Sequence, residues 1–255
     1  MRAAWLIAGS VMTVLALLMS TVALSRGMAM AQAPSEHTTR TIPFPGNSQL
    51  RIEANGGHVR LDIHAGEAGM IVVDRELQWS QAKPSVSEDW NGRTLRLDTS
   101  CVQEWLQEEH CEVDYRLFVP QETDIEVVSS TSPVGVDRVH GDVRVTSVSG
   151  DVRVYDIPGP LRVRSGSGAV RANDLFADQA DVEVGSGHVD LEFRTAPSRV
   201  RAVVRTSGDI DLHLPDAPYD VSANAPQVSV STDHTATSPR KITVSTPEGT
   251  VDICC

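Results

Sequence analysis

The sequence predicts an all-β fold, a single-stranded β-solenoid or β-helix-like array of short strands with a period of about 20 residues. A Ser-Gly-x-Val/Ile unit recurs with glycines at positions 150, 168, 187 and 208, which are 18, 19 and 21 residues apart. Apolar and polar residues alternate on both sides of these glycines, as in strands with one buried face. Valine is abundant and aromatic residues make up only 4% of the chain, which suits a core of β-branched side chains.

Residues 1–31 are predicted to form one hydrophobic helix that precedes this array. Residues 3–24 carry no charge, and at about 1.5 Å per residue such a helix matches the ~30 Å hydrocarbon core of a membrane. This length favours a signal-anchor transmembrane helix with its N-terminus inside, after Arg2. Ala29-Met30-Ala31 is instead typical of signal-peptide cleavage, and a buried core helix is a third alternative. On the first two interpretations, the later residues lie outside the cytoplasm, either held at the cell membrane or secreted.

Residues 32–41 are short and polar and are expected to be a linker, so the β-strand-repeat domain covers residues 42–255. Its N-terminal half, 42–120, is irregular. Alternating residues predict strands near 49–54, 58–63, 70–77, 94–98 and 114–119. Because the loops between them are long, we expect hairpins that widen or cap the first turns of the repeat.

Trp79, Trp90 and Trp105 fall in the loop-rich part of this half. One interpretation is an aromatic surface that binds sugar or peptide. The other, which we favour, is a small satellite core beneath long loops, because tryptophan is a bulky filler wherever most of its surface can be buried.

Cys101 and Cys111 are expected to form a disulfide, because outside the cytoplasm an even number of cysteines favours disulfides. A metal site of these cysteines with His110 is the alternative, but the paired C-x-x-C spacing of a zinc module is absent. Cys254 and Cys255 are adjacent, and disulfide geometry disfavours a bridge between neighbours. A bridge to another molecule, or one cysteine packed inward, both stay open for this pair.

The regular repeats occupy residues 121–255 and extend upstream to Gly57. One turn of about 20 residues cannot bury its apolar side chains alone, whereas stacked turns form a continuous core. Glycine permits a tight corner, and charged residues at alternate positions face water. A flat antiparallel sandwich is the competing fold, since strands spaced 8–12 residues apart also suit it. The near-constant period favours the solenoid.

The order of these motifs resembles a known family. The pattern Cys-x9-Cys-x3-Tyr-x3-Val-Pro runs from Cys101 to Pro120, and Ser-Gly-x-Val units follow it. Both features are similar to the bacterial putative-adhesin family of β-strand-repeat proteins, a domain of unknown function, in its actinobacterial type. The resemblance covers Arg40 to Ile253 and implies repeat architecture. It brings no established catalytic residues, and the Cys254-Cys255 ending lies outside its pattern.

The sequence contains no G-x-S-x-G, H-E-x-x-H, Walker, Rossmann or calcium-repeat motif, so no catalytic residue, metal ligand or cofactor is predicted. The net charge, 22 − 34 = −12, argues against nucleic acid as a partner and against docking of the folded domain on anionic lipid. Carboxylates recur at equivalent repeat positions, where they could bind a cation or act as acid and base. A solvated acidic face is the simpler interpretation, because the ladders are interrupted. Their members are Asp190, Asp211 and Asp252 in one ladder and Asp142, Asp151 and Asp209 in another.

We therefore expect a non-enzymatic extracytoplasmic module that acts as an adhesin, a cell-envelope scaffold or a binding protein. Its expected partners are the membrane, through the N-terminal segment, and a cell-wall glycan or surface protein. A polysaccharide-acting β-helix enzyme that uses the acidic ladders is one alternative. An envelope signalling or stress-response component is another.

Overall fold

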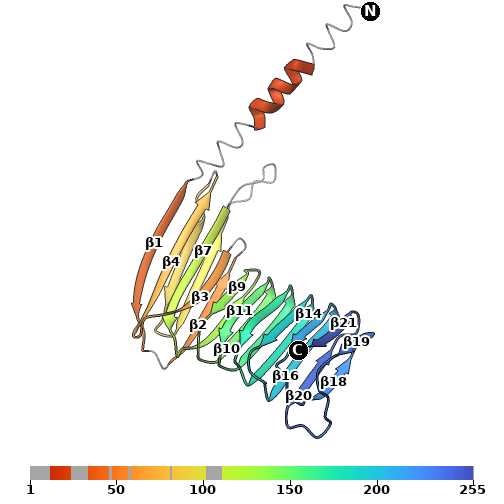
Figure 1. Ribbon diagram of the computed structural model, residues 1–255. Helices are drawn as coiled ribbons and strands as arrows, with labels where there is room; N and C mark the ends of the chain where they lie inside the picture. Colours follow the sequence, from red (N-terminus) through yellow and green to blue (C-terminus); the bar gives the residue numbers. More distant parts are fainter. Residues whose placement is uncertain are drawn as a thin grey trace, which may run out of the picture.

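The computed structural model describes residues 12–23, 34–45, 48–56, 59–80, 82–101 and 111–254. Residues 12–23 form one α-helix, drawn in red in Figure 1, and strands dominate the rest. Over these described ranges, no helix combines the length and the apolar character needed to cross a membrane. The Ala29-Met30-Ala31 pattern lies outside the described residues.

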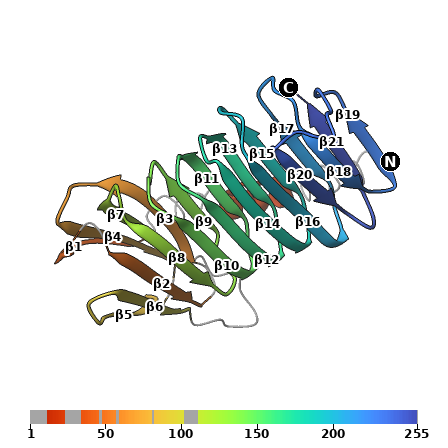
Figure 2. The same ribbon diagram turned by 90° about the horizontal axis from the view of Figure 1, so that it is seen from below.

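The strands form two sheets that face each other as the two walls of a solenoid (Figure 2). Sheet A has eleven strands, in the order β1 (Ser35–Pro43), β4 (Met70–Trp79), β7 (Cys111–Pro120), β3 (Val59–Gly66), β9 (Val134–Asp137), β11 (Val152–Ile157), β13 (Val170–Leu175), β15 (Val189–Phe193), β17 (Ile210–His213), β21 (Thr250–Cys254) and β19 (Gln227–Val230). Sheet B has ten, in the order β18 (Asp220–Asn224), β20 (Lys241–Ser245), β16 (Arg199–Ser207), β14 (Gln179–Ser186), β12 (Leu161–Ser167), β10 (Val143–Ser149), β8 (Asp124–Ser129), β2 (Gln49–Asn55), β6 (Thr94–Ser100) and β5 (Ser85–Trp90).

Each regular coil contributes one strand to each sheet, and successive coils pair in parallel. This arrangement confirms the predicted solenoid and excludes the antiparallel sandwich. Alternate residues point inward, so that apolar side chains form columns between the sheets. One column contains Val152, Val170, Val189, Ile210 and Val251, each at most 1% exposed. Burial of each such side chain contributes about 1.5–3 kcal/mol, and this burial holds the coils together.

The N-terminal end of the stack is closed by antiparallel strands, as the long loops of that half predicted. β4 pairs antiparallel with β7 and with β1, and β5 pairs antiparallel with β6. The segment expected to be a linker, 32–41, is different in the structure: residues from Ser35 onward form the edge strand β1. Because β1 lies at the edge, most of its residues are exposed and polar, and its sequence therefore resembles a linker. β5 was not predicted at all.

A part-buried ion pair lies inside this N-terminal end. Arg75 on β4 and Glu88 on β5 occupy inward positions on opposite sheets, with side chains 15% and 14% exposed. Their Nη1 and Oε1 atoms are 2.6 Å apart, and the hydroxyl of buried Tyr115 donates to the same Glu88 oxygen at 3.3 Å. Burial raises the pKa of Tyr115, so its hydroxyl stays protonated and can donate this bond. The pair joins the two sheets where the apolar columns end.

The last two coils are stacked out of chain order. β20 lies between β16 and β18, and β21 lies between β17 and β19. Stacked glycines of positive φ explain this order. A Cβ on Gly249 would lie 2.1 Å from the carbonyl oxygen of Gly208, so the corner next to Gly208 requires glycine. The corner 224–226 of coil β18–β19 contains no glycine, so this coil does not fit next to Gly208 and lies at the end of the stack.

Candidate binding surface

Trp79 and Trp90, the two predicted tryptophans that the structure describes, lie apart from each other. Trp90, at the end of β5, packs edge-on against Phe44 with ring centroids 6.0 Å apart, and the Phe44 amide donates to Gly69 just before β4. Trp79 is the last residue of β4. A ten-residue strand spans about 30 Å, so Trp79 and Trp90 lie near its opposite ends. Both are partly buried against the core, and Trp105 lies outside the described residues.

The predicted disulfide between Cys101 and Cys111 is confirmed, with Cα atoms 6.3 Å apart. Cys101 follows β6 of sheet B and Cys111 begins β7 of sheet A, so the bridge ties the two sheets together. Because each sulfur is bonded to the other, the two cysteines do not form the alternative metal site, whose His110 lies outside the described residues. Cys254 ends β21 beside His213 on β17, with Sγ 3.1 Å from Nδ1, and Cys255 lies outside the described residues.

The two predicted aspartate ladders have different surroundings. Asp190, Asp211 and Asp252 are register neighbours on β15, β17 and β21 and form a continuous row. The other predicted ladder is wrong, because Asp142 precedes β10 of sheet B, whereas Asp151 and Asp209 precede strands of sheet A. Asp151 accepts the Ala169 amide at 3.0 Å, and Asp209 accepts the Thr250 amide at 2.8 Å. These aspartates therefore fasten one corner to the next coil, which is a structural role.

A shallow depression lies on the outward side of the N-terminal end of sheet A. It is lined by His37, Asp74, Glu76, Asp114 and Arg116. Burial raises the pKa of Asp114, and the charges of Glu112 and Glu76 raise it further, against Arg60 and Arg116. In the described part of the chain, no group of histidine, cysteine and carboxylate side chains has the arrangement to hold a metal ion.

The outward side of β10, β12, β14 and β16 carries the most distinctive cluster of charges, and we name it the arginine face. Parallel pairing places Arg144, Arg162, Asp181 and Arg201 in one row across four strands. Glu183 lies in the neighbouring row, in register with Arg164. The six arginines of the face are Arg144, Arg162, Arg164, Arg199, Arg201 and Arg205.

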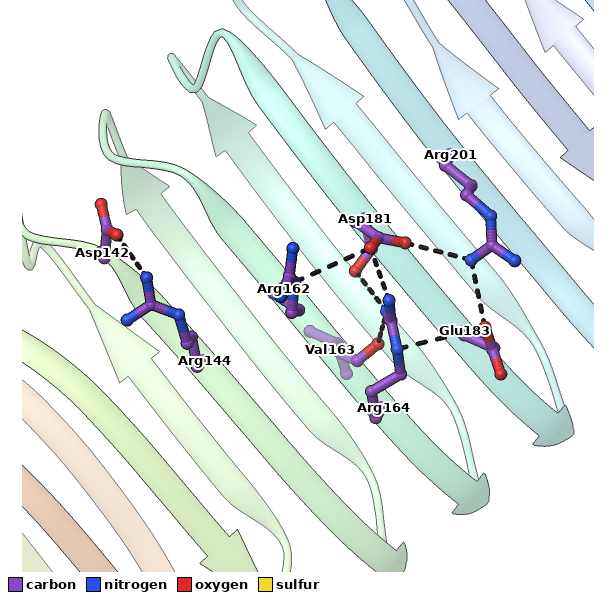
Figure 3. A network of polar contacts seen from close by, with 8 residues as sticks. All are labelled: Asp142, Arg144, Arg162, Val163, Arg164, Asp181, Glu183 and Arg201. Atoms are coloured by element: carbon purple, nitrogen blue, oxygen red, sulfur yellow. Dashed lines mark hydrogen bonds and ion pairs between the residues drawn. The ribbon is translucent and has the colours of Figure 1, made fainter.

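Asp181 and Glu183 hold four of these arginines in place, and Asp142 pairs with Arg144 (Figure 3). Arg201 Nη1 donates to both Asp181 Oδ1 and Glu183 Oε2, each at 3.1 Å. Arg164 donates to Asp181 from the other side and also to the carbonyl oxygens of Val163 and Asp181, both at 3.0 Å. Arg205 pairs with Glu183. Hydrogen bonds within the protein thus orient the guanidinium groups of Arg164, Arg201 and Arg205.

The pKa values of both carboxyls reflect this network. Burial acts to raise the pKa of Asp181, but hydrogen bonds and charge from Arg164 and Arg201 outweigh it, and the pKa is lowered. Burial also acts to raise the pKa of Glu183, but hydrogen bonds from Arg205 and Arg201 outweigh this effect, and the pKa of Glu183 is lowered as well. Both groups are therefore ionised at neutral pH and keep the arginines oriented.

The exposed charge of this face is positive. The Glu183 and Asp181 side chains are 14% and 28% exposed, whereas those of Arg162 and Arg205 are 60% and 67% exposed. The four strands of the arginine face carry 6 − 2 = +4. Strands β11, β13, β15 and β17, on the opposite wall, carry 2 − 5 = −3. The solenoid thus has faces of opposite charge within a chain of net charge −12.

The face has the chemistry to bind repeated anionic groups. Guanidinium is planar and always charged, and it matches carboxylate, phosphate and sulfate groups with paired N–H donors. Neighbouring strands lie about 4.8 Å apart, so arginines on successive strands form a closely spaced row. Sequence reasoning treated these arginines as solvated alternate residues. The sequence did contain a signal for this face: charged residues recur at about the repeat period, with arginines at 144, 162 and 201 and an aspartate at 181.

Comparison with protein families gives a match over almost the whole chain. The family model described as Toastrack DUF4097 covers residues 25–253. The chain belongs to this family. The Toastrack assignment agrees with the resemblance to a putative-adhesin family of unknown function, while the actinobacterial type stays a prediction.

Several solved structures match most of the Toastrack chain at low sequence identity. A putative adhesin from Bacteroides fragilis is 13% identical with a TM-score of 0.45, and the match covers 86% of this chain and 97% of that one. A putative cell adhesion protein from Clostridium sporogenes is 10% identical with a TM-score of 0.37, over 87% and 99%. A putative lipid binding protein from Parabacteroides distasonis is 10% identical with a TM-score of 0.35, over 84% and 96%. No curated protein matches the chain significantly.

Proposed function

We propose that this Toastrack protein is a non-enzymatic, extracytoplasmic binding module of the cell envelope that holds an anionic glycan on its arginine face. The observation that carries the proposal is the set of six arginines on one wall, with exposed guanidinium groups above less exposed carboxylates. The membrane is the proposed partner of the N-terminal segment, which is uncharged over residues 3–24.

The charge distribution favours a polymer over a small ligand. The arginines spread over four strands instead of converging on one pocket, and the face follows the solenoid axis. A chain of repeated carboxylate, sulfate or phosphate groups laid across the strands contacts several guanidiniums at once. The overall negative charge of the protein repels such a polymer elsewhere and limits binding to this wall.

The test compares two double variants of equal charge. Arg162→Gln with Arg205→Gln removes two exposed charges from the arginine face, and Arg153→Gln with Arg171→Gln removes two from the opposite wall. Binding of the full chain to an immobilised uronate polysaccharide and to a neutral glucan is measured at several salt concentrations. We expect the first variant to lose at least tenfold in affinity for the uronate polymer and to show a weaker salt dependence, with the second near wild type. Equal losses in both variants, or equal binding to the neutral glucan, would refute the proposal.

A polysaccharide-cleaving enzyme is a second candidate, favoured by the continuous row of Asp190, Asp211 and Asp252 on sheet A. Paired carboxylates can act as acid and base at a glycosidic bond. Release of reducing sugar from the same uronate polymer, abolished by Asp211→Asn but not by Asp252→Asn at the end of the row, would support it. Binding without release of product supports the module.

A further inference from the structure

The C-terminal end of the stack differs from the other three sheet ends in having an unprotected edge strand. β1 and β5 are the edge strands at the N-terminal end of the two sheets. β1 carries Glu36, Arg40 and Pro43, and β5 carries Glu88 and Asp89. β18 begins with a charged residue, and residues 233–235 bridge to Tyr219, immediately before it, while the Val221 amide donates to His234. β19, Gln-Val-Ser-Val, has no charge and no proline. Natural proteins use charge, proline or covering segments to prevent strand edges from pairing.

β19 also leaves core positions uncovered. Val228 and Val230 are in register with Val251 and Ile253, which are 1% and 0% exposed. They therefore continue the inward apolar columns, yet they are 45% and 40% exposed because, among the described residues, no strand pairs with the outer edge of β19. The structure thus ends with two apolar side chains at positions that every earlier coil buries.

The backbone of β19 is oriented to accept one more strand. The Ser231 amide donates to the Ile253 carbonyl at 2.8 Å, and alternation along the strand gives Ser229 the same direction, toward β21. The N–H and C=O groups of Val228 and Val230 therefore point away from the sheet. Two residues with outward donors and acceptors, next to two exposed valines, form a short template for strand addition.

We propose that β19 pairs antiparallel with β19 of a second copy, about a twofold axis at Ser229. In this register Val228 lies opposite Val230 of the other copy, and the two pairs exchange four hydrogen bonds. Both valines stay on the core side, and the two Ser229 side chains meet on the outward side. Moving the twofold axis by one residue, to Val228, would place Pro226, which lacks an N–H, opposite Val230.

A second copy fits this edge because the edge is neutral and complementary to itself. Two chains of net charge −12 repel each other over most surfaces, but β19 brings no like charges together. A twofold interface uses the same patch on both subunits, and each copy buries the other's exposed valines. The pairing is centred on β19, since residues 233–235 cover the start of β18.

The test uses the full chain in a mild detergent and measures its protein mass by sedimentation over a concentration series. We expect a concentration-dependent dimer in the wild type, a monomer in Ser229→Lys, and a dimer in the control Ser222→Lys. Ser222 is an exposed serine on β18 of the same coil, and Ser229 faces outward, so neither change disturbs the core. The lysine charges of Ser229→Lys meet at the twofold axis.

Ser229→Cys provides an independent readout that does not depend on weakening the fold. Mild oxidation should link the two copies through residue 229, as identified by peptide mapping, and the control Ser222→Cys should not form a homodimeric link. A wild-type monomer throughout the series, a dimer that Ser229→Lys leaves unchanged, or equal loss in Ser222→Lys would overturn the proposal. None of these readouts involves glycan binding.

Discussion

Replacing Gly208 with alanine tests whether close stacking of corner glycines sets the spacing of the coils. Gly208 has a φ of 144°, and a Cβ there would lie 1.8 Å from the Gly187 carbonyl oxygen. The obstructing atom belongs to the backbone, so it cannot rotate away as a side chain would. Gly69 is the matched control: its φ is 86°, but a Cβ there would meet nothing within 4 Å.

The two variants separate backbone strain from steric conflict. Gly69→Ala introduces only strain, of about 1–3 kcal/mol for a non-glycine residue in a sparsely populated conformation. Gly208→Ala adds the displacement of a neighbouring coil, which for overpacking costs about 1–3 kcal/mol more. We therefore expect Gly208→Ala to reduce the free energy of unfolding by about 2–6 kcal/mol in total.

Urea denaturation of the full chains, followed by circular dichroism at a strand wavelength, measures both values. Hydrogen exchange adds location: amides of β16, β17, β20 and β21 should lose protection in Gly208→Ala. If Gly208→Ala is no more destabilised than Gly69→Ala, the stacked glycines are not in steric contact and the explanation of the coil order is wrong.

Three further changes address the cap and the arginine face. Glu88→Ala removes the 2.6 Å ion-pair partner of Arg75, which keeps only Thr38 and the longer contact to Glu36, and should cost about 3 kcal/mol in urea denaturation, whereas a well-packed apolar pair at both positions should restore most of that loss. Reduction of the Cys101–Cys111 disulfide should cost about 3 kcal/mol on chain-entropy grounds, measured as a shift in the urea midpoint; an unchanged midpoint would contradict this. Because the pKa of Asp181 is lowered on folding, its ionised form adds stability that is present above the usual aspartate pKa and is lost as the pH falls through the folded-state value. In Arg201→Gln, a carbon-detected NMR titration should show that pKa moving up toward the usual value, and no movement would sink the assignment of the ion pair.

Local patterns predicted the strands whose faces differ in polarity. The alternation of Met70–Leu77 and Thr94–Asp98 corresponds to β4 and β6, because each strand has one buried and one exposed side. β1 was interpreted as a linker because only Ile42 among its residues is buried. β5 was missed because Glu88, at an inward position, is charged, and its partner Arg75 is remote in sequence.

The arginine face could not be predicted with the same certainty, because it depends on register. Arg164 and Arg201 are 37 residues apart in sequence, and only the parallel pairing of three strands brings both to Asp181. The order of the last coils has the same origin. The sequence shows a glycine at position 249 and no glycine at 224–226. That this difference sets the coil order follows only from the structure, in which a Cβ on Gly249 would lie 2.1 Å from the Gly208 carbonyl oxygen.

The exchanged positions of the last two coils have a consequence for how the protein is made. During synthesis, coil β18–β19 leaves the ribosome before coil β20–β21, although β20–β21 is the layer between it and the rest of the stack. A chain interrupted after Val230 would thus lack an internal layer instead of an outer one, and its last coil would face a glycine corner that it does not fit. Unlike a solenoid that grows in chain order, this end can form only when residues 241–254 arrive. Partly made or clipped chains should therefore expose their apolar columns and be recognised by proteases.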